Sequence, residues 1–229
     1  MKIVVNGGTR GIGIEIVRSL ASDRNNKIIS TGRNIDKLYE LSLAYPNIIP
    51  LKTDMADFQS HSEEYFKSVS ALFDTIDVLI NVTGLLINRE FTNTSDSDAR
   101  LIMDVNFFGP ASSIKVLRPL MRNGSHIVNI SSMGGYLGSS KYKGLAYYSS
   151  AKAAISCLTE CLAEEFREDG IRVNCLALGS VNTEMLQKAF PGYKAPVSAT
   201  EMGEFIASFA MNGHKVFNGK VLPVAVTNP

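Results

Sequence analysis

Hydrophobic and polar positions follow two patterns that alternate along this 229-residue chain. Short runs that are almost entirely apolar are typical of strands buried on both faces of a parallel sheet. Between these runs lie longer stretches with the length expected of helices. The apolar runs predict seven strands, over residues 3–5, 27–30, 48–51, 78–81, 126–131, 172–178 and 220–224. The stretches between them predict six helices, over residues 11–21, 35–44, 58–73, 97–121, 147–168 and 200–211.

This alternation of strands and helices predicts the fold class. Parallel strands joined by helices need right-handed crossovers, which place helices on both faces of the sheet. The sequence contains no internal repeat, linker or low-complexity segment. We therefore expect one doubly wound α/β domain of the Rossmann type over residues 1–229, with a seven-stranded, mostly parallel sheet. The irregular segments 133–145 and 185–198 follow late strands, where such sheets bind ligands, and 185–198 is the expected substrate loop.

Composition excludes several classes of function. The formal net charge is +1 and no run of Lys and Arg is present, so we expect neither nucleic acid nor a membrane as a partner. No apolar stretch is long enough to span a bilayer, and the amino terminus does not resemble a signal peptide. Three cysteines and three histidines lack a metal-binding pattern, so no metal site is expected. These features predict a cytoplasmic protein whose cysteines are small packing residues.

A glycine-rich turn, NGGTRGIG (residues 6–13), joins the first predicted strand to the first helix. Glycines permit a sharp bend there and let a pyrophosphate approach the N–H groups at the helix amino terminus. This position predicts a dinucleotide-binding site, although the spacing differs from the commoner G-x-G-x-x-G. The residues expected to contact the cofactor are Gly7, Thr9, Arg10, Gly11, Ile12 and Gly13.

Two arginines indicate which dinucleotide is bound. Arg33 follows the second strand, where many NAD-binding sheets carry an acid, and Arg10 lies within the glycine turn. Guanidinium groups beside the adenosine ribose suit a 2′-phosphate, which favours NADP(H) as the cofactor, with NAD(H) as the alternative. The other interpretation is that both arginines are ordinary solvated surface residues.

The stretch YYSSAK (residues 147–152) contains candidate acid–base chemistry. Residues four positions apart share a helix face, so Tyr148 and Lys152 are neighbours, whereas Tyr147 points elsewhere and is expected in packing or in the wall of the substrate pocket. A nearby ammonium stabilises a phenolate, so the pair could act as a tunable proton donor and acceptor. The same spacing also fits an ordinary amphipathic helix with a buried tyrosine and a lysine that reaches solvent.

Several motifs together resemble the short-chain dehydrogenase/reductase family over nearly the whole chain. The turn NGGTRGIG is similar to the family's T-G-x-x-x-G-x-G, with Asn6 in the threonine position. The other motifs, in chain order, are Asp54 after the third strand, NVTG (81–84), VNFFG (105–109), NISSMGG (129–135), YSSAK (148–152) and LGSVNT (178–183). Each motif lies on the element where the family carries it.

The resemblance implies roles for individual residues. It makes Tyr148 the proton donor, with its pKa lowered by Lys152 and by the cationic nicotinamide of the oxidised cofactor. It makes Ser132 the second hydrogen-bond donor to the substrate oxygen, and Asn106 the holder of a water that relays protons. The catalytic set is therefore Asn106, Ser132, Tyr148 and Lys152. The cofactor contacts that the resemblance adds are Asp54, Met55, Asn81, Gly84, Tyr148, Lys152, Gly179, Val181 and Thr183.

The implied activity is hydride transfer between a nicotinamide and a small-molecule ketone or secondary alcohol. The resemblance further implies a homodimer or homotetramer assembled through helices 97–121 and 147–168. Chain length favours a likeness to 3-oxoacyl-carrier-protein reductases, while the polar stretch 138–143 would suit a sugar or another polar substrate. One rival interpretation is a nucleotide-sugar epimerase, but such enzymes usually carry a carboxyl-terminal substrate domain, and too few residues follow Thr183 to form one. The other is a non-catalytic sensor or scaffold that binds NAD(P).

Overall fold

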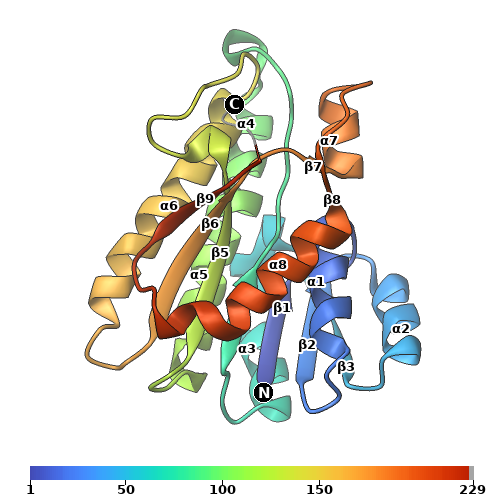
Figure 1. The fold of residues 1–229 in the computed structure, drawn as a ribbon, viewed down its shortest axis with the longest axis vertical. Coiled ribbons are helices and arrows are strands. Elements are labelled where there is room, and N and C mark those ends of the chain that lie inside the picture. The colour runs from blue at the N-terminus through green and yellow to red at the C-terminus, as the bar shows by residue number, and fades with distance from the viewer. Residues whose placement is uncertain (227–229) are drawn as a thin grey trace.

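A seven-stranded parallel sheet forms the centre of the protein (Figure 1). The computed structural model describes residues 1–226, so the last three residues of the predicted domain lie outside the described part. The strands are β1 (Lys2–Asn6), β2 (Lys27–Gly32), β3 (Ile48–Lys52), β4 (Val78–Asn81), β5 (His126–Ser132), β6 (Arg172–Leu178) and β9 (Val221–Val224). All seven predicted strands are confirmed, within two residues at each end.

The strand order is β3-β2-β1-β4-β5-β6-β9, with every neighbouring pair parallel. The chain first builds outward from β1 to β3, then returns to the other side of β1 with β4 and continues to β9. The direction of winding therefore changes between β1 and β4. In open α/β sheets, the carboxyl ends of the strands at such a point border the ligand crevice.

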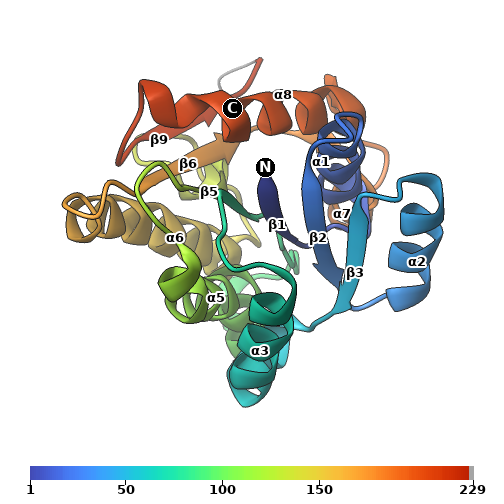
Figure 2. The same ribbon diagram turned by 90° about the horizontal axis from the view of Figure 1, so that it is seen from below.

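Helices cover both faces of the sheet (Figure 2). On one face lie α1 (Gly11–Ala21), α2 (Ile35–Ala44) and α8 (Ala199–Asn212), and on the other α3 (Ser62–Leu72), α5 (Gly109–Leu117) and α6 (Ala146–Glu165). Successive side chains of a strand point to opposite faces, so Ile3 and Val5 pack with α1 and α8 while Val4 packs with α3 and α5. The doubly wound Rossmann-type fold predicted from the sequence is confirmed.

The prediction of one continuous helix over residues 97–121 was wrong. The structure has α4 (Asp96–Met103), a π-helical segment (Asp104–Phe108), α5 and a final 3₁₀ turn (Arg118–Leu120). Pro110 has no N–H to donate to the carbonyl of Asn106, and Gly109 bonds the carbonyl of Asp104, five residues earlier. The extra residue in this turn places Asn106 on the buried side of the helix.

Two other predicted segments differ from the structure. The helix predicted over 58–73 begins as a 3₁₀ segment (Met55–His61) and becomes α-helical only in α3. Asp54 caps this segment, because its side chain accepts a hydrogen bond from the N–H of Ala56. The expected substrate loop 185–198 contains a short helix, α7 (Glu184–Ala189), and is closed by pairing of β7 (Val181–Asn182) with β8 (Val197–Ser198).

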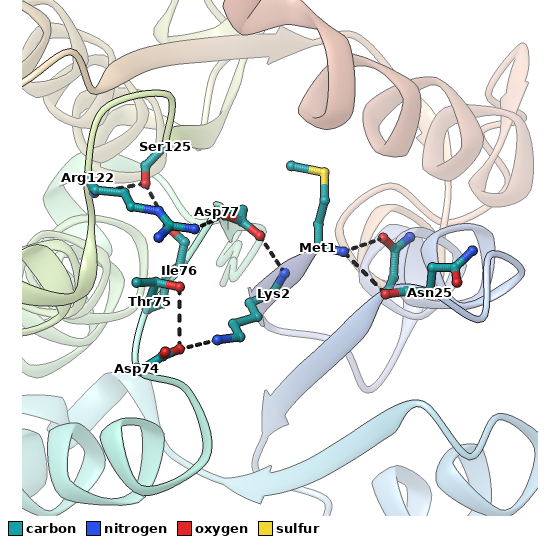
Figure 3. A network of polar contacts seen from close by, with 10 residues as sticks. Met1, Lys2, Asn25, Asp74, Thr75, Ile76, Asp77, Arg122 and Ser125 are labelled. Atoms are coloured by element: carbon teal, nitrogen blue, oxygen red, sulfur yellow. Dashed lines mark hydrogen bonds and ion pairs between the residues drawn. The ribbon is translucent and has the colours of Figure 1, made fainter.

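A polar network fixes the amino ends of the central strands, far from the glycine turn (Figure 3). The backbone N–H of Lys2 donates to Asp77 at 2.8 Å, and Lys2 Nζ pairs with Asp74. Arg122 Nη2 lies 3.7 Å from Oδ1 of the same Asp77, and Ser125 Oγ donates to the carbonyl of Ile76. These contacts hold the starts of β1, β4 and β5 together, which helps to align their opposite ends.

Residues 1–226 contain no helix that is both long and apolar enough to cross a membrane. Within the same residues, no group of three or more His, Cys, Asp or Glu side chains could hold a metal ion. Cys175 is buried, as expected of a packing residue, but Cys157 and Cys161 are exposed on α6. The sequence did not distinguish these positions, because α6 presents a mixture of small residues on both its buried and its exposed side.

Candidate active site

A cavity of about 530 Å³ lies at the carboxyl ends of β1, β4, β5 and β6. These strand ends point toward the top of Figure 1. The glycine turn and the YSSAK motif, far apart in the sequence, line this same cavity. The predicted site residues that line it are Gly7, Thr9, Arg10, Gly11, Ile12, Gly13, Arg33, Asp54, Met55, Gly84, Ser132, Tyr148, Lys152, Gly179, Val181 and Thr183. Asn81 and Asn106 are the two predicted residues that do not.

The glycine turn has the shape needed to hold a pyrophosphate. Gly7 adopts φ +104°, and a Cβ at Gly13 would collide with the carbonyl oxygen of Gly7. The N-cap residue of α1, Arg10, makes no side-chain hydrogen bond to the first turn, and that turn carries no acidic residue. The N–H groups at this helix end therefore have no competing side-chain anion, which suits a bound phosphate.

A group of basic side chains lies beside this turn. Arg10 and Arg33 are exposed and line the cavity, and neither forms a salt bridge within the described residues. Arg33 also lines a neighbouring pocket with Lys52 and His61. The pairing of β2 with β3 places Lys52 directly opposite Gly32, which precedes Arg33. Lys52 and His61 were not predicted, because only the sheet register brings them to this edge.

Three of the four candidate catalytic side chains lie near the end of β5. Ser132 is the last residue of β5, and its hydroxyl is hydrogen-bonded to the phenol of Tyr148 on α6. Ser132 Oγ also accepts from the N–H of Gly134 at 3.2 Å, which fixes the hydroxyl. Lys152 lies one turn along α6, with Nζ 5.9 Å from the centre of the Tyr148 ring. The predicted i, i+4 neighbourhood is therefore present.

Burial shifts both titratable groups of this set toward their neutral forms. Burial raises the pKa of Tyr148, and the hydrogen bond with Ser132 offsets part of that rise. Burial lowers the pKa of Lys152 from 10.5 to about 8. Lys152 Nζ donates to the carbonyls of Ile130 at 2.9 Å and Thr83 at 3.4 Å instead of to the phenol. The prediction that Lys152 lowers the pKa of Tyr148 therefore does not match this arrangement.

The profile of the short chain dehydrogenase family matches residues 1–194. The chain belongs to this family. Dehydrogenase/reductase SDR family member 6 from Aquarana catesbeiana is 31% identical over 210 residues, covering 90% of this chain and 80% of that protein. A dehydrogenase/reductase structure from Sinorhizobium meliloti has a TM-score of 0.84 at 25% identity, covering 97% of this chain and 92% of that one. A Burkholderia cenocepacia short chain dehydrogenase, solved with NADP, has a TM-score of 0.85 at 22% identity, with 97% and 95% covered.

Family membership makes this short-chain dehydrogenase an oxidoreductase. It confirms the family-level part of the sequence prediction, whose motifs all lie within the described residues. The finer likeness to 3-oxoacyl-carrier-protein reductases stays a prediction, as do the roles of single residues.

In this short-chain dehydrogenase, the side chain of Asn106 hydrogen-bonds backbone groups beside the cavity. Its side-chain nitrogen donates to the carbonyls of Leu85 and Ile102, both at 2.8 Å, and its oxygen accepts from the N–H of Leu85 at 3.2 Å. A Cβ placed on Gly84 would lie 3.6 Å from Asn106 Oδ1 and 3.9 Å from Lys152 Nζ. Asn106 therefore fixes the chain after β4 next to Lys152, and both hydrogens of its side-chain amide are donated to backbone carbonyls.

Asn81 is buried behind the cavity wall rather than in it. Its side-chain oxygen accepts from Asn6 at 2.8 Å, and its nitrogen donates to Asn129 at 2.9 Å. Asn129 in turn donates to Thr159 on α6 at 3.0 Å. The predicted cofactor contact by the Asn81 side chain is therefore not supported, because all of its polar atoms point across the sheet.

The far part of the cavity, beyond Ser132 and Tyr148, was largely missed by sequence reasoning. Its walls come from three segments that are distant in sequence: the chain after β4, the loop after β5, and the chain from α7 to residue 193. The residues involved are Leu85, Leu86, Met133, Tyr142, Leu145, Leu186, Phe190 and Tyr193. Tyr147 does not line the cavity; it stacks on Phe91 with ring centres 5.4 Å apart, so the packing alternative holds.

Proposed function

We propose that this chain is an NADP(H)-dependent reductase that interconverts a ketone and a secondary alcohol, with Tyr148 as the general acid. The observation that carries the proposal is that Ser132, Tyr148 and Lys152 face the same cavity as the glycine turn and its two arginines. A hydride donor held by the turn and a carbonyl held by the serine and tyrosine would therefore share one cavity. The fit of the glycine turn to a pyrophosphate supports this arrangement.

The chemistry asks different things of each side chain. A bound nicotinamide supplies the hydride to the carbonyl carbon, or accepts it from the alcohol. The Tyr148 hydroxyl gives its proton to the carbonyl oxygen as negative charge builds there. Ser132 donates a second hydrogen bond to that oxygen and fixes its position. Lys152, mostly protonated at neutral pH with a pKa of about 8, holds positive charge next to the reacting oxygen.

The protonated state of Tyr148 fits its role as a proton donor. A phenol whose pKa is raised by burial keeps its proton at neutral pH and can serve as a donor. The reverse reaction needs the phenolate, which burial disfavours.

The preference for NADP(H) rests on charge at the adenosine end of the cavity. Arg10 and Arg33 are accessible and carry no salt bridge within the described residues, so both can bind an anion. Lys52 and His61 add basic groups at the edge of the neighbouring pocket. The Burkholderia cenocepacia short chain dehydrogenase, which has a similar fold, was solved with NADP, and this agrees with the proposal.

Fluorescence titration of NADPH and NADH measures this preference directly. The wild type should bind NADPH more tightly than NADH, and Arg33→Ala should weaken NADPH binding by about tenfold or more while leaving NADH binding unchanged. Arg24→Ala, an exposed arginine outside the cavity, is the matched control. Equal or better binding of NADH would contradict the cofactor preference. Tight NADPH binding without turnover of any carbonyl would favour the sensor or scaffold alternative.

We also propose assembly through the helices α4, α5 and α6, as the family resemblance implies. Leu101 is 38% and Phe108 43% exposed along the broken helix that contains Asn106. Light scattering should show a dimer or tetramer that dissociates in Phe108→Asp. Leu43→Asp, at an exposed position on α2, should leave the oligomer intact. A monomeric wild type would contradict the proposal.

A further inference from the structure

The part of the cavity beyond Ser132 and Tyr148 indicates which substrates the site accepts. Three segments enclose it, and they are attached to one another. The N–H of Arg89 donates to the carbonyl of Gly144 at 3.0 Å, which joins the chain after β4 to the loop after β5. The side chain of Asn88 donates to the carbonyl of Ala189 at 2.9 Å, which joins the first of these to α7. The walls are therefore preformed.

These walls are almost entirely hydrocarbon or aromatic. They are formed by Leu85, Leu86, Met133, Tyr142, Leu145, Leu186, Phe190 and Tyr193, of which only the two tyrosines carry a polar side-chain group. The hydroxyl of Tyr193 is already engaged, since it donates to Ser180 Oγ at 3.3 Å. A substrate arm placed here would find apolar surface and few polar partners.

The charged groups near this part of the cavity oppose an anionic substrate. The cationic residues that line the cavity are Arg10 and Arg33, at the adenosine end, and the buried Lys152. Glu184, on the first turn of α7, also lines the cavity and is negative. A carboxylate or phosphate on the substrate would therefore lose hydration without gaining a cationic partner.

The polar stretch 138–143 does not supply the missing hydrogen bonds. Lys141 Nζ donates to the carbonyl of Tyr136 and to Ser139 Oγ, and Lys143 pairs with Glu90. From this stretch, only Tyr142 lines the cavity. The expectation that this loop suits a polar substrate therefore gains no support from the structure.

We propose that the substrate is an uncharged ketone, or the corresponding secondary alcohol, whose larger substituent is apolar and lies against Leu186 and Phe190. The inference rests on the proposed reductase function and narrows it to one substrate class. Removing apolar surface from water is the main gain that these walls offer. A chain that carries hydroxyl groups gains less here, and a charged chain is disfavoured.

The first test is a series of methyl alkyl ketones, from butanone to octanone, reduced with NADPH. kcat/KM should rise about fourfold for each methylene that the pocket buries. Levulinate and methyl isoamyl ketone have the same shape but differ in charge, and levulinate should be reduced at least about 100-fold less efficiently. A flat series, or a preference for levulinate or for dihydroxyacetone, would overturn the proposal.

Variants of α7 connect the selectivity to the proposed wall. Leu186→Ala and Phe190→Ala should each reduce the gain per methylene, and Leu186→Lys should shift the ratio of levulinate to methyl isoamyl ketone upward by about tenfold or more. Phe205→Ala is the matched control, because Phe205 is 46% exposed on α8 and does not line the cavity. Unchanged selectivity in all three variants of Leu186 and Phe190 would place the substrate elsewhere and overturn the proposal.

A binding measurement separates this inference from the proposed function. Ketones cannot accept a hydride from NADP⁺, so calorimetric titration of the same ketones into the enzyme with NADP⁺ reports affinity without turnover. An affinity that rises with chain length but no reduction by NADPH would sink the reductase function while the apolar pocket stands. Reduction of ketones without any dependence of affinity on chain length would sink the inference alone.

Discussion

The side-chain nitrogen of Asn6 donates a 2.8 Å hydrogen bond to the side-chain oxygen of Asn81, between the ends of β1 and β4. Both side chains are buried, at 0% and 2% exposed. The hydrogen bonds continue through Asn129 on β5 to Thr159 on α6. This buried chain links the start of the glycine turn to the helix that carries Tyr148 and Lys152. It also gives a structural reason for the asparagine that replaces the family's threonine at position 6.

Asn81→Ala should lower the free energy of unfolding by about 2–4 kcal/mol, because Asn6 Nδ2 and Asn129 Oδ1 each lose a buried hydrogen bond to Asn81 and a small cavity opens. Urea unfolding followed by circular dichroism measures this change. Asn93→Ala, at an exposed position before α4, should change stability by less than about 0.5 kcal/mol. Equal effects of the two substitutions would mean that the buried network contributes little.

Lys152→Met should stabilise the protein near neutral pH while it abolishes turnover. The pKa of Lys152 is about 8 in the folded chain and 10.5 ordinarily, so folding releases protons between these values and stability rises with pH there. The burial penalty is present below pH 8 and corresponds to about 3 kcal/mol. The advantage of Lys152→Met should therefore shrink as the pH increases from 8 to 10.5. Parallel pH profiles for wild type and variant would contradict this account.

His126 should make the protein sensitive to acid. Burial lowers its pKa from 6.5 to about 4, while its ring bonds the carbonyl of Ala210 at 2.9 Å and the side chain of Asn174 at 3.0 Å. The neutral ring is favoured in the folded chain, so stability is present above pH 6.5 and is lost as the pH falls toward 4. Between pH 6.5 and 4, the free energy of unfolding of His126→Gln should fall by about 3 kcal/mol less than that of the wild type. Thermal unfolding at a series of pH values measures the difference, with His214→Gln as the control for the neighbouring ring.

Ser132→Ala should lower kcat by about 10²- to 10³-fold and leave NADPH binding intact, because it removes one hydrogen bond to the reacting oxygen but no cofactor-turn residue. Ser131→Ala is a comparison within the same motif, since the Ser131 hydroxyl donates to the carbonyl of Lys152 and is buried. A larger loss of turnover in Ser131→Ala than in Ser132→Ala would show that Ser132 is not the serine that contacts the substrate.

The sheet was predictable because its strands are buried on both faces and read as unbroken apolar runs. The neighbourhood of Tyr148 and Lys152 was predictable from helical spacing, whereas Ser132 was predicted from the resemblance to the family's motif. The break before Pro110 had a local signal, since proline interrupts a helix, but the apolar pattern alone predicted a continuous helix. The bonds between Asn106 and Leu85 were not predictable, because Leu85 is distant in sequence. Periodicity describes one element at a time and contains no information on such partners.

The electrostatics of the site and the apolar substrate wall also escaped sequence reasoning. The spacing of Tyr148 and Lys152 predicts a shared helix face but not the direction of Nζ, which turns to the carbonyls of Ile130 and Thr83. The wall residues Leu186 and Phe190 lie in a segment without a motif. Their function follows only from the pairing of β7 with β8, which folds that segment over the cavity.

Tyr148→Phe tests the central claim most directly, through kcat/KM for reduction of an apolar methyl ketone with NADPH. The substitution removes only the hydroxyl that gives its proton to the substrate oxygen, and NADPH titration of the same sample confirms that the cofactor site is intact. We expect turnover to fall by about 10²- to 10⁴-fold while NADPH binding is unchanged. Turnover within a few-fold of the wild type would show that another group delivers the proton, and would contradict the account.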